Sequence, residues 1–417
     1  MPSTSRVFRA TLPLLFVAVA VPLAVRAQDA PAASSPWARE AIRSAKLAEE
    51  RTILVATPEG YATSKDRYPV LVLLDANDRP QFALAVANAA FLASRNAIPP
   101  LIVVGVANGK DRTHDMTPAA TGKTATTFNT AGGANEFADF ITGEVLPMIR
   151  AKYRTLPTTI LAGHSFGGLF ALHVAATKPG AFAGVIAISP SLWWNDSTLA
   201  ATYADAIAKS AATPRLFVTS GGLEPDIDRT TQRFVSRLDS VKPATLASAY
   251  RRYPDDTHGL TPAPSLADGL RFVFEPVSMV KLPVAKLGPH SDSASVVAAV
   301  LETEQTYARN ARSLGLPEKV PEPVFNQLGY GVLGALKMPG LAIWVFQRNV
   351  ALYPESANVY DSLGDAYVAA GDTSAAKAQF RRAVAIATRT GDPVLSESRR
   401  KLDALEHAAQ AGKPKPE

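Results

Sequence analysis

From residue 51 onward, apolar side chains fall into short unbroken runs separated by stretches with helical spacing. The first run, 51–58, predicts a strand, and the second and third, 69–76 and 100–108, are nearly all apolar, as expected for strands buried on both faces of a parallel sheet. Between the second and third runs, apolar residues at 81–96 recur at intervals of three and four, which indicates a helix. This alternation predicts an α/β domain.

The alternation continues to residue 277. Further strands are predicted at 158–163, 184–191, 215–221 and 247–254, and helices at 135–153, from 166 onward and near 230–238. A long polar stretch at 109–133 has no pattern of its own, and such loops often form lids or binding elements. We therefore expect residues 40–277 to form a mostly parallel sheet covered by helices on both faces.

The chain after residue 277 has a different character. Residues 278–293 are rich in Pro and Gly and predict a linker, residues 294–408 read as helical, and residues 409–417 predict a flexible tail. Ala342, Phe346 and Val350 recur as Ala376, Phe380 and Val384, and Leu328-Gly329 recurs as Leu363-Gly364, offset by one.

A period near 34 residues resembles the tetratricopeptide repeat, in which two helices close through a small residue. The sequence thus predicts a small all-α C-terminal domain like that repeat. Two units are too few for a free-standing solenoid, so we expect the tail to pack on the α/β domain or on a second copy of the chain. A protein partner for the tail is the further expectation.

The first 27 residues have the pattern of a secretory signal peptide. Arg6 and Arg9 precede an apolar stretch that ends near Val25, and Ala27 supplies a small residue at the cleavage site. The stretch is short for a membrane span. We expect a periplasmic or secreted protein with no stable membrane insertion after cleavage; an uncleaved anchor is the alternative.

Composition excludes several kinds of site. The chain has no cysteine, so it has no disulfide, thiolate metal site or cysteine nucleophile. Its net charge of +6 includes the basic ends, and Lys and Arg do not cluster among aromatic residues, so nucleic acid is not an expected partner. Neither His114 with Asp115 nor Asp226 with Asp228 has metal-site spacing, so neither metal nor cofactor is expected.

The candidate nucleophile is Ser165, in the run Gly163-His164-Ser165-Phe166-Gly167. The run follows a buried-type strand and opens a helix. Small residues at both ends permit a sharp turn that leaves the serine hydroxyl at the top of the sheet. The N-terminus of the following helix favours an anionic intermediate there.

A serine hydroxyl needs a base, and His258 is the candidate because it follows the last predicted strand. The other five histidines are less suitable. His114 precedes the serine, His164 lies in the strand-to-helix turn 163–167 (the elbow), and His173 lies in an apolar helix. The last two, His290 and His407, belong to the C-terminal segments. We expect the His164 side chain to point away from the hydroxyl and His173 to be a core residue.

The acid is sought in the loop after the strand at 215–221. Glu224 comes first after the Gly221-Gly222 turn and is our choice; Asp226, Asp228 or no carboxylate at all are the alternatives. The oxyanion needs two N–H donors, one from Phe166 and one from the loop around Ala76 and Asn77.

Several segments together carry a family resemblance: YPVLVLLDAND, DRTHDMTP, GHSFGGLFALH, AISPSLWWND, and the stretch from YPDDTHG to DGLRFVFEP. Residues 45–276 thereby resemble the esterase D / enterochelin esterase-like family of α/β hydrolases. The resemblance implies the α/β-hydrolase fold and a serine esterase with Ser165 as nucleophile and His258 as base. It also implies Asn77 as the second oxyanion donor, with Asp75 shaping its loop.

Members that open siderophore trilactones are similar in the elbow and the Trp-Trp segment, and some of them use a Ser/His dyad. Trp193 and Trp194 are expected to form an apolar or stacking wall for substrate, with plain packing as the alternative. Arg112 is expected to meet a negative or oxygen-rich substrate, with a structural Arg112–Asp115 pair as the alternative.

These observations predict an exported serine esterase that acts on a small-molecule ester, a siderophore lactone or another acyl ester. An acyltransferase that uses the same serine is one alternative. The other is a binding or scaffold protein whose hydrolase domain is inactive.

Overall fold

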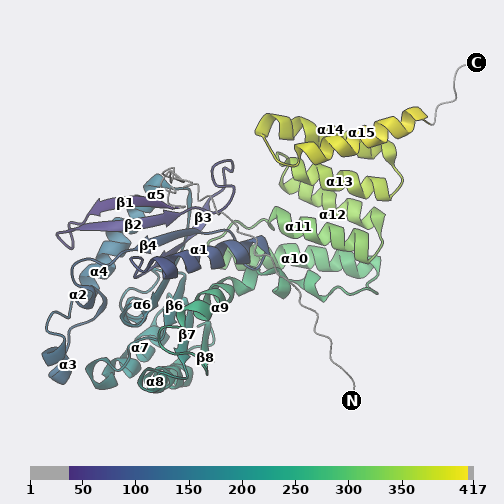
Figure 1. Cartoon of the computed structure of the whole chain (residues 1–417). Helices are drawn as coiled ribbons and strands as arrows, with labels where there is room; N and C mark the ends of the chain where they lie inside the picture. Colours follow the sequence, from purple (N-terminus) through teal and green to yellow (C-terminus); the bar gives the residue numbers. More distant parts are fainter. Residues whose placement is uncertain (1–36, 412–417) are drawn as a thin grey trace, which may run out of the picture. The chain divides into compact units, whose positions relative to one another are not determined.

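The computed structural model describes residues 37–411 (Figure 1), and its centre is one mixed sheet. The strands are β1 (Ala38–Arg43), β2 (Glu50–Ala56), β3 (Tyr68–Leu73), β4 (Ile102–Val106), β5 (Thr155–His164), β6 (Gly184–Ile188), β7 (Arg215–Gly221) and β8 (Ser248–Tyr253). Their order is β1-β2-β4-β3-β5-β6-β7-β8. β2 is antiparallel to β1 and β4, and every later neighbour is parallel. This is the α/β-hydrolase arrangement that the sequence predicts.

The helices connect these strands in sequence. In the α/β part they are α1 (Arg79–Ser94), α2 (Arg112–Met116), α3 (Gly122–Thr127), α4 (Ala134–Phe140), α5 (Leu146–Lys152), α6 (Phe166–Thr177), α7 (Thr198–Lys209), α8 (Pro225–Val241) and α9 (Pro262–Phe274). A π-helical turn, Ile141–Val145, joins α4 to α5.

Alternate residues of the central strand β3 pack on opposite faces of the sheet. Leu71 and Leu73 belong to the apolar cluster that includes residues of α1 and α9. Val70 and Val72 belong to the cluster that includes residues of α4 to α8. Because both faces are covered, both sets of side chains are buried, which explains the unbroken apolar run at this position.

The sequence-based prediction misses three elements and misreads a fourth. β1 reads AREAIR and is mostly exposed at one edge of the sheet, where charged residues are usual; its pattern therefore lacks an apolar run. The helices α7 and α9 are also absent from the prediction. The stretch at 109–133, expected to be a loop, contains the short helices α2 and α3.

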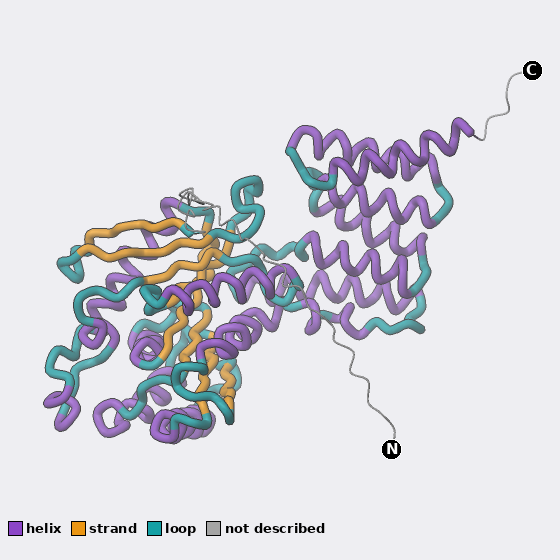
Figure 2. The backbone as a smooth tube through the Cα atoms, in the orientation of Figure 1, coloured by secondary structure: helices purple, strands orange, loops and turns teal. Residues whose placement is uncertain are grey.

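The C-terminal part is all helical, with α10 (Ser293–Ser313), α11 (Glu322–Tyr330), α12 (Pro339–Leu352), α13 (Ala357–Ala369), α14 (Thr373–Thr390) and α15 (Leu395–Ala411). From α11 to α15, consecutive helices lie side by side (Figure 2). α15 continues into the segment expected to be a flexible tail, and residues 412–417 lie outside the described part.

The internal repeat has a structural counterpart. A Cβ added at Gly329 on α11 would overlap the ring of Phe346 on α12, and a Cβ added at Gly364 on α13 would overlap the ring of Phe380 on α14. In both pairs a small residue allows two helices to approach closely. The assignment to the tetratricopeptide class, and a protein partner for the tail, stay predictions.

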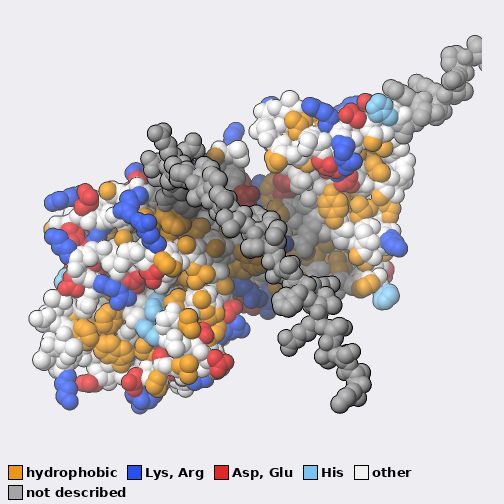
Figure 3. Space-filling view, in the orientation of Figure 1, with side chains coloured by type: hydrophobic (Ala, Val, Ile, Leu, Met, Phe, Trp, Pro, Cys, Tyr) orange, Lys and Arg blue, Asp and Glu red, His pale blue; other side chains and the backbone are white. Residues whose placement is uncertain are grey.

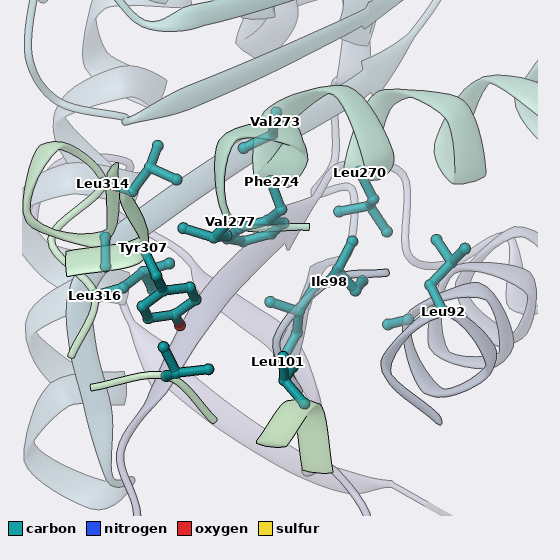
Figure 4. Close-up of a cluster of buried hydrophobic side chains, with 14 of the residues drawn as sticks. Leu92, Ile98, Leu101, Leu270, Val273, Phe274, Val277, Tyr307, Leu314 and Leu316 are labelled. Atoms are coloured by element: carbon teal, nitrogen blue, oxygen red, sulfur yellow. The ribbon is translucent and has the colours of Figure 1, made fainter. Parts of the chain in front are cut away.

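The helical tail packs on the α/β part. This is the first of the two arrangements expected from the sequence, the other being packing on a second copy of the chain. Tyr307, Leu314 and Leu316 point toward Ile98 and Val277 in one buried cluster (Figure 4). The segment expected to be a linker contributes Leu282 and Val284 to the same cluster.

Polar contacts cross the same contact region. Thr158 Oγ1 on β5 donates to the Leu314 carbonyl at 2.6 Å, and Asn96 Nδ2 donates to Gln327 Oε1 at 3.1 Å. The chain from Trp37 onward forms one compact unit. The contacts thus give no boundary within this unit. The domain limits 40–277, 278–293 and 294–408 stay a prediction from composition.

The predicted signal peptide, residues 1–27, lies outside the described residues. Between residues 37 and 411, no helix combines the length and apolar character that crossing a membrane requires. Side chains of both charges are intermixed on the visible face (Figure 3).

Candidate active site

Ser165 lies in a strained turn between β5 and α6. Its φ of 61° is in the left-handed region, which residues with a Cβ seldom adopt. A Cβ at Gly163 would overlap the Gly167 carbonyl, and a Cβ at Gly168 would come within 2.7 Å of the Ile188 carbonyl. The small residues of the motif are therefore required by close backbone contacts on both sides of the serine.

The loops after β7 and β8 bring Glu224 and His258 together. Glu224 Oε2 accepts a hydrogen bond from His258 Nδ1 at 2.5 Å. The Glu224 side chain is only 4% exposed, whereas that of His258 is 37% exposed. A buried carboxylate that orients a partly exposed imidazole is the arrangement that serine hydrolases use.

Two glycines allow these loops to touch. A Cβ at Gly221 or Gly222 would overlap a carbonyl oxygen of the loop that leads to His258. The Gly222 N–H donates to the Tyr253 carbonyl at 2.7 Å, and the Leu223 N–H donates to the Asp256 carbonyl at 3.0 Å. The loop that carries the acid is thus attached by its backbone to the loop that carries the base.

The alternative acids are engaged elsewhere. Asp226 is exposed and pairs with Arg229 within the first turn of α8. Asp228 accepts from Ser220 at 2.7 Å and from Arg252 at 2.8 Å. Of the carboxylates considered from the sequence, Glu224 is the one that contacts His258.

The environment of Glu224 favours its ionised form. Burial alone would raise the pKa of this carboxyl, but hydrogen bonds from His258, the Gly221 N–H and the Ser189 hydroxyl outweigh burial and lower the pKa below its ordinary value. An ionised Glu224 accepts the Nδ1 proton of His258, which leaves Nε2 available as a base.

His164 supports the same histidine from the other side. Its Nε2 lies 2.9 Å from the His258 carbonyl, and the two rings have centroids 4.3 Å apart. Burial, and secondarily the neighbouring His258, lower the pKa of His164 to about 4. The ring is therefore neutral near pH 7 and, because a carbonyl only accepts, carries its proton on Nε2.

The sequence predicts only that the His164 side chain points away from the Ser165 hydroxyl. The contact with the His258 backbone was not foreseen, because the two residues are far apart in the chain. His173 is, as expected, a core residue: its ring nitrogens bond Tyr203 Oη at 2.9 Å and Asn135 Oδ1 at 3.0 Å.

One expected oxyanion donor, Phe166, directly follows Ser165, and the other, Asn77, is on the loop between β3 and α1. Phe166 is the first residue of α6, where a helix N–H has no partner within the helix. Within residues 37–411 the Asn77 N–H contacts no acceptor, while its side chain accepts from the Asn108 N–H at 3.3 Å. Asp75, with φ of 58°, turns the chain just before Asn77.

Sequence reasoning missed the serines of the segment AISPSLWWND. Ser191 Oγ lies 3.4 Å from Ser165 Oγ, and its N–H donates to the Ser165 carbonyl at 3.2 Å. Ser189 Oγ lies 2.5 Å from Glu224 Oε1. The left-handed φ of 42° at Ser189 follows a strand of five residues; no hydrophobic pattern signals such a turn.

The structural alternative for Arg112, an ion pair with Asp115, is wrong because Arg112 pairs with a different aspartate. Arg112 bonds Asp75 through Nε at 2.5 Å and Nη2 at 2.9 Å. Asp115 instead pairs with the buried Arg51 at 2.5 Å. Arg112 also stacks over the Phe166 ring and remains about a third exposed. A role for Arg112 in substrate binding stays a prediction.

Trp194 is fully buried, which argues against the expected direct contact with substrate in this conformation. It packs against Phe128 and Phe166, with ring centroids 5.1 and 5.5 Å apart. Its neighbour Trp193 is only partly buried and contacts the same two rings. The packing alternative therefore suits Trp194, and the partly exposed wall beside Ser165 is formed by Trp193, Phe128 and Phe166.

Comparison with known families places this site in context. A family model described as "Putative esterase" matches residues 44–254. The chain belongs to this esterase family. The match contains the elbow and Glu224 and ends just before His258.

Curated relatives of this chain include the siderophore enterobactin esterase of Emericella nidulans, which is 31% identical over 171 residues; the match covers 34% of this chain and 56% of the relative. The iron(III) enterobactin esterase of Escherichia coli K12 is 28% identical over 265 residues, 60% of each chain. The chain thus spans less than two thirds of the length of these relatives.

Among solved structures, an IroE-like serine hydrolase from Shewanella oneidensis is 27% identical with a TM-score of 0.60, covering 73% of this chain and 98% of its own. An uncharacterised protein from Capnocytophaga ochracea, 16% identical with a TM-score of 0.57, covers 89% of this chain and 99% of its own. The second likeness concerns the fold alone.

Proposed function

We propose that this protein is a serine esterase that hydrolyses carboxylic esters with Ser165, His258 and Glu224. The observation that carries the proposal is the hydrogen bond between Glu224 and His258 beside the elbow. The His258 ring lies against the tilted ring of His164, with centroids 4.3 Å apart. His164 directly precedes Ser165, so the imidazole lies against the turn that carries the hydroxyl.

The reaction follows from this placement. His258 Nε2 takes the proton of Ser165 as Oγ attacks the ester carbonyl, and Glu224 stabilises the imidazolium that forms. The N–H groups of Phe166 and Asn77 donate hydrogen bonds to the carbonyl oxygen as it becomes negative. His258 then protonates the leaving alcohol, and water, activated by the same histidine, releases the acid from Ser165.

The substrate class that we propose is a siderophore with ester linkages. The relatives named as siderophore esterases support this choice. The aromatic wall of Trp193, Phe128 and Phe166 supports a substrate with a flat apolar group, because aromatic faces stack on such groups.

We also propose that the protein is exported, because residues 1–27 have the composition of a signal peptide. The amino-terminal sequence of the protein recovered from its native cell checks this: a start at Gln28 supports cleavage, and a start at residue 1 or 2 contradicts it.

The experiment for the proposed reaction compares hydrolysis of p-nitrophenyl esters and of an iron-loaded trilactone siderophore. Ser165→Ala and His258→Ala should each abolish turnover. Ser240→Ala and His290→Ala replace exposed residues of the same types and should retain it. Unchanged turnover in Ser165→Ala would remove the proposed nucleophile. Added alcohols that yield new esters instead of acid would identify acyl transfer.

A further inference from the structure

Ser189 is a buried hydroxyl that no step of the proposed reaction uses. It directly follows β6, is fully buried and has a left-handed φ of 42°. Its N–H still donates to the Thr219 carbonyl on β7 at 3.0 Å. Strained backbone of this kind persists only where the surrounding structure holds it, and it concentrates at functional sites.

The side chain of Ser189 meets the half of the carboxylate that His258 does not use. Ser189 Oγ lies 2.5 Å from Glu224 Oε1, whereas His258 Nδ1 bonds Oε2. An ionised carboxylate only accepts, so the hydroxyl donates its single proton to Glu224. The Gly221 N–H donates to the same Oε1. Two donors therefore hold one oxygen, which leaves the other facing His258.

Thr261 in turn orients Ser189. The two hydroxyl oxygens are 2.9 Å apart. Because the Ser189 proton is used on Glu224, Thr261 must be the donor in this pair. Thr261 Oγ1 is also 3.0 Å from the His258 carbonyl, which can accept a second hydrogen bond beside the one from His164. The Thr261 hydroxyl therefore lies within hydrogen-bond distance of both Ser189 and the backbone of His258.

We propose that Ser189, oriented by Thr261, is a positioning residue that fixes the Glu224 carboxylate so that Oε2 faces His258 Nδ1. This inference rests on the proposed function and adds a residue to it. Ser189 is fully buried, so it acts on the reaction only through Glu224.

A double-mutant cycle tests that route. Ser189→Ala should lower kcat about tenfold, the effect of losing a hydrogen bond to a charged group, with little change in KM. In a Glu224→Ala background the same substitution should change kcat by less than about twofold, because the residue it acts through is gone. Ser265→Ala, at another fully buried hydroxyl that pairs with Thr219, is the matched control and should retain kcat.

Thr261 offers a second series for the case in which Ser189→Ala does not fold. Thr261→Val removes the donor and should lower kcat in the same direction, whereas Thr261→Ser keeps the hydroxyl and should restore it. Equal kcat in Thr261→Val and Thr261→Ser would overturn the proposal, as would an equal loss for Ser189→Ala in both Glu224 backgrounds.

A spectroscopic readout separates this inference from the proposed reaction. The Nδ1 proton of His258, bonded to Glu224, should give a downfield NMR signal in protein with ¹⁵N-labelled histidine. Ser189→Ala should move or broaden this signal, and Ser265→Ala should leave it in place. If the signal responds but the wild-type protein hydrolyses no ester, the proposed function fails and the positioning role stands. A signal that ignores Ser189→Ala would overturn the positioning role.

Discussion

Arg112 holds the Asp75 carboxylate with two hydrogen bonds, Nε to Oδ1 at 2.5 Å and Nη2 to Oδ2 at 2.9 Å. The same guanidinium donates to the His164 carbonyl at 3.3 Å. Arg112 therefore connects the loop of Asn77, one expected oxyanion donor, with the end of the strand that carries Ser165. A planar guanidinium can make this bidentate contact and a lysine cannot.

Replacing Arg112 should impair catalysis through the donor loop. Arg112→Met releases Asp75, and displacement of the Asn77 N–H by about 1 Å would cost on the order of 10²-fold in kcat. Arg112→Lys should recover only part of this loss. Arg237→Met removes a bidentate Arg–Asp pair from the surface and serves as the control. Equal steady-state kcat for Arg112→Met and Arg237→Met would contradict the role given to Arg112.

The two neighbouring tryptophans should have different roles, Trp193 in substrate binding and Trp194 in packing. Trp193→Ala removes a partly exposed ring and should raise KM for aryl esters more than for acetate esters. Trp194→Ala empties a fully buried site and should lower the free energy of unfolding by about 3–5 kcal/mol. Urea titrations and initial rates of both variants check this. If Trp194→Ala changed KM but not stability, the division would be wrong.

Much of this architecture follows from local sequence, and the site follows only in part. The apolar runs locate β2 to β7 because those strands are largely buried, whereas β1 has no apolar run because it is an exposed edge strand. The elbow is visible because its small residues are neighbours in the chain. The Arg112–Asp75 and Ser189–Glu224 contacts join residues 37 and 35 positions apart, and no periodicity reports such pairs.

Spacing along the chain also suggests the wrong partner for Arg112. Arg112 and Asp115 are three residues apart, a spacing that suits a helical ion pair. The short helix α2 instead turns Asp115 inward, where it is buried beside Arg51. Only the packing of α2 against α4 and α6, together with the position of Arg51 on β2, decides between these partners.

The buried neutral histidines should make stability depend on pH. Burial lowers the pKa of both His164 and His173 to about 4, against 6.5 in the unfolded chain. As pH falls from 6.5 toward 4, the unfolded chain binds these protons first, so the free energy of unfolding falls, by an amount of order 3 kcal/mol for each histidine.

His173→Gln tests this dependence away from the proposed catalytic residues. The variant should be less stable than wild type at pH 7, but its free energy of unfolding should fall less steeply between pH 6.5 and 4. Urea titrations at four pH values measure both slopes. Parallel curves for wild type and variant would show that His173 does not stay neutral in the fold.

The contact between the helical tail and the α/β part should be essential to folding. Leu314 is 5% exposed within the shared cluster, so Leu314→Ala should lower the free energy of unfolding by about 2–4 kcal/mol. Leu301→Ala, the same change at a side chain that is 39% exposed on α10, should cost much less.

Because the tail and the α/β part form one compact unit, esterase activity and helical circular dichroism should be lost over the same urea range in both leucine variants. Two separate transitions would indicate that the tail folds independently, which would contradict the structural role of Leu314.

Labelling with a fluorophosphonate, followed by mass spectrometry of the modified peptide, tests the central claim most directly. The reagent forms a stable bond with a serine only where a base activates the hydroxyl and donors stabilise the developing charge. We predict one label per chain, on Ser165, with labelling slowed strongly in His258→Ala and Glu224→Ala and absent in Ser165→Ala. A folded wild-type protein that stays unlabelled, or carries its label on another residue, would contradict the account.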